Sequence, residues 1–99
     1  MWKGKRKMIK TVDIEYVGVE DIQEIIDDIY AVIKDGHHAT FHMMPVTNAI
    51  YIDVNIMIGG FDVNKDYDYK CTFAITDKDE DINAMNDCKI VLKRLLMEE

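Results

Sequence analysis

The chain has 99 residues, a formal net charge of −7 and 48% hydrophobic residues. This length accommodates one hydrophobic core, and the ordinary apolar content with a single proline argues against a disordered chain. No run of eighteen apolar residues occurs, and Asp13 and Glu15 stand where the apolar core of a signal peptide would have to lie. We therefore expect a single-domain cytoplasmic protein without a membrane-spanning segment.

The charges divide unevenly along the chain. The first ten residues carry five bases and no acids, which is +5, whereas the rest of the chain carries seven bases and nineteen acids, which is −12. We expect residues 1–7 to form a basic N-terminal extension and residues 8–99 to form a single acidic α+β domain. Trp2 among the bases of the extension suits weak contact with nucleic acid, but the acidic body argues against nucleic acid as the main partner.

In the first half of the domain, the pattern of apolar residues predicts a strand and then a helix. In residues 8–17 the apolar side chains of Val12, Ile14 and Tyr16 alternate with polar ones, which is the pattern of a half-buried strand. After Gly18 the spacing changes to that of a helical stripe, which Asp35-Gly36 brings to an end. The residues of this stripe are Ile22, Ile25, Ile26, Ile29 and Ile33.

Three strands and a second helix are predicted to follow. Residues 37–44, 49–58 and 67–75 alternate, and the middle segment has the strongest pattern, with its even-numbered residues from Ile50 to Ile58 facing inward. The last helix is predicted to begin at Thr76 or Asp77 and to carry an apolar stripe. The predicted fold is an α+β two-layer sandwich of order β-α-β-β-β-α, with a four-stranded mixed sheet and both helices on one face.

In this fold the second face of the sheet is open. The alternation places Met44, Tyr51 and Met57 on it, and exposed thioethers and aromatic rings are typical of interfaces. The alternative is that these side chains only pair across strands on a surface without a partner. Cys71 and Cys88 fall on the inward faces, where we expect reduced thiols that pack in the core.

We find no catalytic signature, cofactor loop or complete metal site in the sequence. The chain has no serine, and Gly59-Gly60 lacks the pattern of a phosphate-binding loop. His38 and His42 are about 13 Å apart along one strand face, too far to share a metal ion. The acidic loop at 62–68 departs from a calcium loop at Tyr67 and Phe73. We expect no enzyme, cofactor or metal site, with weak cation binding or catalysis as the third alternative.

The leading functional prediction is a small non-catalytic binding module whose acidic surface contacts a basic protein partner. One concrete version is an inhibitor of mobile-element or phage type, whose carboxylates imitate the phosphates of nucleic acid. The alternative is a homo-oligomeric structural or adaptor domain, in the simplest case a homodimer, that associates through the open sheet face. The predicted partner-binding residues are Glu20, Asp21, Glu24, Asp27, Asp28, Asp77, Asp79, Glu80, Asp81, Met44, Tyr51 and Met57.

Overall fold

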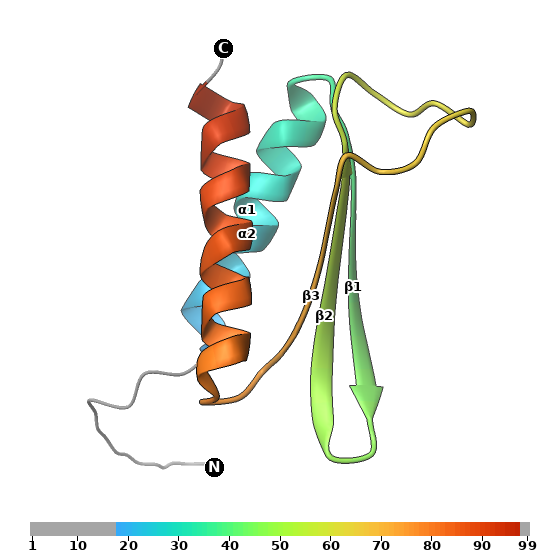
Figure 1. Ribbon diagram of the computed structural model, residues 1–99. Coiled ribbons are helices and arrows are strands. Elements are labelled where there is room, and N and C mark those ends of the chain that lie inside the picture. The colour runs from blue at the N-terminus through green and yellow to red at the C-terminus, as the bar shows by residue number, and fades with distance from the viewer. Residues whose placement is uncertain (1–17, 98–99) are drawn as a thin grey trace.

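A computed structural model describes residues 18–97, which form two helices packed on one face of a three-stranded antiparallel sheet (Figure 1). The α+β class is therefore confirmed. The predicted strand at 8–17 and the extension at 1–7 lie outside the described residues. The elements in chain order are α1 (Val19–Lys34), β1 (His38–Val46), β2 (Ala49–Met57), β3 (Tyr69–Ala74) and α2 (Asp79–Met97).

Both ends of α1 follow from local sequence. Gly18 is the N-cap in an extended conformation, and its N–H donates to Asp21 Oδ2 at 3.0 Å. At the other end Gly36 has φ +103°, which favours glycine, and His37 N donates to Val32 O. This pattern of bonds is a Schellman ending, so the predicted stop at Asp35-Gly36 is confirmed.

The sheet has the order β1-β2-β3, with β2 in the centre. Its register pairs Met43 with Ile52 and Ile52 with Phe73, so these inward side chains form one layer beneath the helices. β1 continues through Pro45 to Val46, past the predicted end at Met44. Pro45 lacks an N–H group, and an edge strand tolerates this because one side of its backbone has no partner strand.

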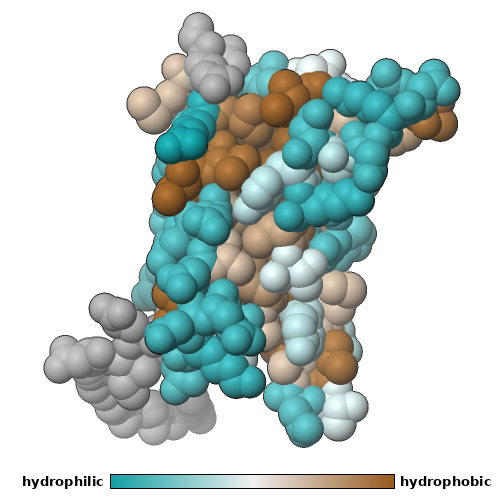
Figure 2. All heavy atoms as spheres, in the orientation of Figure 1, coloured by the Kyte–Doolittle hydropathy of each residue, from teal (hydrophilic) through white to brown (hydrophobic). Residues whose placement is uncertain are grey.

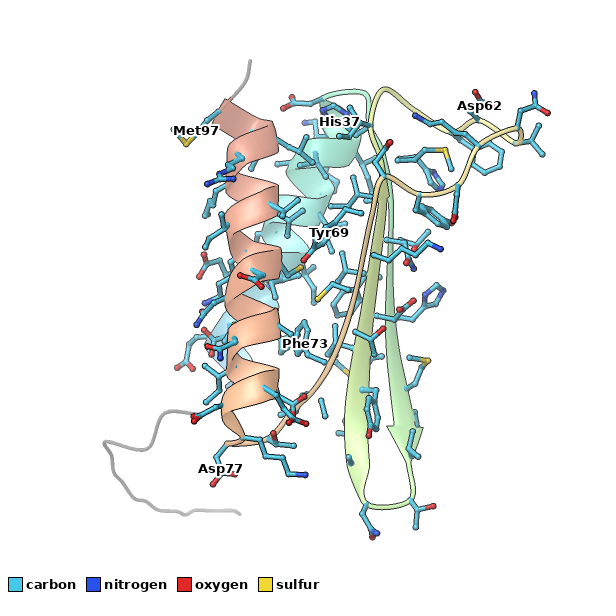
Figure 3. The ribbon with its side chains drawn as sticks, in the orientation of Figure 1. His37, Asp62, Tyr69, Phe73, Asp77 and Met97 are labelled. Carbon is cyan, nitrogen blue, oxygen red and sulfur yellow. The ribbon has the colours of Figure 1, made fainter. Side chains whose placement is uncertain are left out.

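The core lies between the sheet and the helices. Its most deeply buried large side chains are Ile25, Ile52, Ile56, Phe73 and Leu92, each at most 1% exposed. Figure 3 shows Phe73 on β3 directed toward α2. Both helices therefore use a single apolar stripe to cover one sheet face, as the sequence predicted.

Three residues depart from the predicted burial. Ile26 and Ile33 on α1 are 39% and 46% exposed, and Ile50 on β2 is 41% exposed. All three were expected in the core. The inward alternation also ends before Ile58, which is 48% exposed beyond the end of β2. Within residues 18–97, no helix is long and apolar enough to cross a membrane.

Candidate partner-binding surfaces

A ladder of ion pairs joins α1 to α2 and uses three of the predicted partner-binding carboxylates. Lys89 bonds Asp21 and lies 3.4 Å from Glu24, whereas Lys93 lies 3.6 Å from Glu24 and 2.9 Å from Asp28. From one ion pair to the next, the residue numbers rise on both helices, so α1 and α2 run in the same direction. The two lysines offset most of the charge of these three acids within the molecule.

The protonation of the ladder follows from these contacts. Burial alone would raise the pKa of Asp21, but the bonds from Lys89 and from the Gly18 N–H lower it below its ordinary value. For Lys93, the nearby carboxylate of Asp28 is the main cause of a raised pKa. Both shifts favour the charged forms of Asp21 and Lys93.

Asp28 is the most buried member of the ladder, with only 8% of its surface exposed. Lys93 Nζ is close enough to Asp28 Oδ2 for an ion pair, yet it is not aligned as a hydrogen bond, and no other donor among the described residues reaches this oxygen. The Lys93–Asp28 pair therefore joins the two helices at a buried position on α1. We therefore place Asp28 in the helix interface, where a partner has little access to it.

The start of α2 presents a different set of acids. Asp81 turns back toward the sheet, where its Oδ1 accepts from Ala74 N at 3.0 Å and its Oδ2 accepts from the Thr76 hydroxyl at 2.5 Å. The Thr76 bond is the main cause that lowers the pKa of Asp81. The helix itself begins at Asp79, because Asp81 N and Ile82 N both donate to Lys78 O. The predicted start at Thr76 or Asp77 was two to three residues too early.

The other three acids at this helix start have no partner among residues 18–97. Asp77, Asp79 and Glu80 are exposed and make no side-chain hydrogen bond or ion pair within the described part of the chain. Figure 3 shows Asp77 at the end of the molecule where α2 begins, and Figure 2 shows hydrophilic side chains gathered over this end. Because α1 begins toward the same end, exposed Glu20 contributes a further carboxylate to it (Figure 1). Asp27 lies two turns along α1 and accepts a bond from Gln23.

Two of the three side chains predicted on the open sheet face are exposed there. Met44 and Tyr51 are directly paired across β1 and β2 and are 39% and 37% exposed. The prediction that Met57 is exposed was wrong, since it is 2% exposed. Its place on the strand has the expected parity, but the loop after β2 folds over it, and Asp62 N contacts its Sδ at 3.0 Å. Phe61 from the same loop packs edge-on against His38, the strand partner of Met57.

The three histidines and two of the loop acids contact other side chains or backbone groups of the protein. His37 Nδ1 accepts from Gly59 N, His38 packs between two aromatic rings, and His42 lies 3.7 Å from Asp53. In the loop, Asp66 and Asp68 pair with lysines. No group of three or more metal-ligating side chains occurs in the described part of the chain.

The two thiols sit between β3 and α2. Cys88 is completely buried and Cys71 is partly buried, and both are free. A hydrogen bond from the Cys88 thiol lowers the pKa of Cys71 to about 7 despite burial, whereas the pKa of Cys88 is raised. Sequence reasoning placed both residues on the core side but did not find this difference, because it depends on which atoms of the two elements meet.

One apolar surface of the protein was not predicted from the sequence. A groove of about 390 Å³ lies between the first half of α1 and the sheet end next to the β1–β2 turn. It explains why Ile26 and Ile50 are exposed, since the sheet and the helix diverge here. Ile25 and Ile26 point about 100° apart around the helix axis, so one of them lies at the edge of the apolar stripe, and this was the available signal. The lining residues are Gly18, Val19, Ile22, Gln23, Ile26, Met43, Ile50 and Ile75.

Comparison of the chain with protein-family models, with curated proteins and with solved structures finds no match.

Proposed function

We propose that the protein is a small non-catalytic binding module that acts in the cytoplasm through its acidic surface on a basic protein partner. The observation that supports this proposal most directly is the start of α2, where Asp77, Asp79 and Glu80 are exposed and unpaired within residues 18–97. The fold uses Asp81 at this point, and one or two acids satisfy the helix dipole. Three more carboxylates repel one another, and a cationic partner would relieve that repulsion.

The wider charge distribution supports the same proposal. Residues 18–97 contain fifteen acids and seven bases, a balance of −8, and Lys89 and Lys93 lie in the ladder between the helices. The free acids at the start of α2, with Glu20 and Asp27 on α1, lie on rigid helices, which hold a fixed spacing of charge. A field of one sign raises the rate at which an oppositely charged surface is encountered.

The concrete version of this proposal is a nucleic-acid mimic. Nucleic-acid-binding proteins present basic grooves that take up a row of phosphates. Carboxylates fixed along a helix start offer such a groove a similar row of negative charge. The protein would then inhibit its partner by occupying the groove, as an inhibitor encoded by a phage or another mobile element does.

The test compares two triple variants with the same change in net charge. The first is Asp77→Asn, Asp79→Asn, Glu80→Gln at the start of α2; the control is Asp35→Asn, Asp62→Asn, Asp87→Asn at other exposed acids. Full-length protein is used to capture basic proteins from cell extract at low salt, and each captured protein is purified and titrated against both variants. Exposed ion pairs contribute roughly 0.2–1 kcal/mol each, so we expect the first variant to bind about tenfold more weakly.

The control defines what would contradict the proposal. If both variants lose affinity equally, the interaction depends only on diffuse charge, and if neither does, the start of α2 is not the binding surface. Competition by duplex DNA for the same partner tests the mimic version, since a protein in the groove and DNA exclude each other. Binding that persists at high salt would also count against it.

A second candidate is self-association through the open sheet face, and the exposed Met44–Tyr51 pair favours it. Val46, which is 53% exposed, lies two residues after Met44 and therefore on the same face of the sheet. Light scattering over a concentration series would then find a dimer that tolerates salt and is lost in Tyr51→Glu. Thr72→Glu, on the polar part of the same face, is the matched control.

A further inference from the structure

The apolar groove beside α1 exposes side chains that a folded protein normally covers. Ile26, Met43 and Ile50 on its walls are 39%, 49% and 41% exposed, and Val19 at its mouth is 81% exposed. Among the described residues, Gln23 has the only polar side chain that lines it. A contiguous apolar surface of this kind marks a place where another segment or molecule binds.

The chain outside the described residues begins at this groove. Gly18 lines it and has φ −112° and ψ 176°, so the backbone enters α1 in an extended conformation. The residues immediately before it in the sequence include Val12, Ile14 and Tyr16, with polar residues at alternate positions. In an extended chain all three lie within about 20 Å of Gly18, which is within reach of the groove.

We propose that residues 12–17 of the same chain occupy the groove, with Ile14 and Tyr16 against Ile26, Met43 and Ile50. The covalent connection at Gly18 gives this segment an effective concentration in the millimolar range without any further contact. The alternating pattern presents one apolar side to the groove and leaves Asp13 and Glu15 directed away from it. Those two acids then add negative charge beside Glu20.

The size of the groove favours this segment over a second copy of the protein. Eight residues line it, whereas a stable interface between proteins takes about 20–30 residues from each side. A short apolar segment matches a groove of that size. The exposed pair Met44–Tyr51 lies on the opposite face of the sheet, so self-association there would leave the groove uncovered.

The direct test is nuclear Overhauser contact in the full-length protein. We expect contacts from the methyl groups of Ile14 and the ring of Tyr16 to the methyl groups of Ile26, Met43 and Ile50. A sample that mixes isotope-labelled and unlabelled protein distinguishes contacts within one chain from contacts between chains. Contacts seen only between chains would assign the groove to a second copy and overturn the proposal, as would the absence of any contact from residues 12–17.

Two single substitutions test the same contact by stability. Ile14→Asp places a charge on the apolar side of the segment, and Thr11→Asp places the same charge at the residue just before the segment, in register with its polar side. We expect Ile14→Asp to lower the melting temperature by about 5 °C, the shift that about 1 kcal/mol causes in a domain of this size, and Thr11→Asp to leave it nearly unchanged. Equal melting temperatures for wild type and both variants would contradict the proposal, and removal of residues 1–7 should have no effect.

Discussion

Lys93 on α2 holds its ammonium group 2.9 Å from Oδ2 of Asp28, a carboxylate on α1 that is 8% exposed. The lysine is half exposed, so its removal opens space to solvent without creating a cavity. The carboxylate has no such freedom, since it would be left buried without a cation. The cost of breaking this pair therefore falls on Asp28.

We expect Lys93→Met to lower the melting temperature clearly, because it leaves the Asp28 charge buried and unpaired. Lys70→Met is the matched control, since Lys70 pairs at the same distance with Asp66, whose side chain is 73% exposed. Thermal unfolding followed by circular dichroism measures both. Asp28→Asn in the Lys93→Met protein should recover much of the loss, and strict additivity of the two substitutions would show that the pair does not couple the helices.

The Asp28–Lys93 pair could not be predicted from the sequence. Spacing within α1 identified Ile22, Ile25 and Ile29 as its buried stripe, because the helical period depends only on that segment. The same spacing left Asp28 among the free acids, since nothing local indicates that Lys93 lies opposite it. Likewise, alternation gave the correct side of the sheet for Met57, but its burial depends on a loop that covers only this end of the face.

Stability should fall in acid through Asp21 and Asp81, whose pKa values are both lowered in the folded state. A lowered pKa means that the folded protein binds protons less readily than the unfolded chain. The stabilising contribution is therefore complete above the unfolded value of about 3.9 and is lost as the pH falls through the folded values. We expect the free energy of unfolding to decrease below about pH 4.

The source of this acid dependence can be isolated by substitution. Urea unfolding between pH 2 and 6 should show a shallower decrease for Asp81→Asn than for the wild type, with a lower stability at pH 6 because the bonds to Ala74 and Thr76 are weakened. Asp79→Asn removes an exposed carboxylate from the same helix start and should retain the wild-type slope. An unchanged slope in Asp81→Asn would mean that other groups cause the acid sensitivity.

Met57 should contribute to stability, whereas Met44 should not. Met57→Ala removes a side chain buried under the loop after β2 and should cost about 2 kcal/mol, the lower end of the range for buried methionine, because the covering loop can settle into the space. Met44→Ala, on the exposed end of the same face, should change the free energy of unfolding by less than about 0.5 kcal/mol. Chemical denaturation measures both values, and similar costs would contradict the burial difference.

Cys71 should be the reactive thiol of the folded protein. The neighbouring Cys88 side chain lowers the pKa of Cys71 to about 7, whereas Cys88 is fully buried and its pKa is raised, so Cys71 is the more readily deprotonated thiol. Alkylation with iodoacetamide, followed by mass spectrometry, should label Cys71 first, at a rate that rises through about pH 7. In Cys71→Ser the native protein should resist labelling until denaturant is added. Equal labelling of both thiols in the native state would contradict this difference. Buried Cys88 can be labelled only if α2 separates from β3, whereas Cys71 is partly exposed.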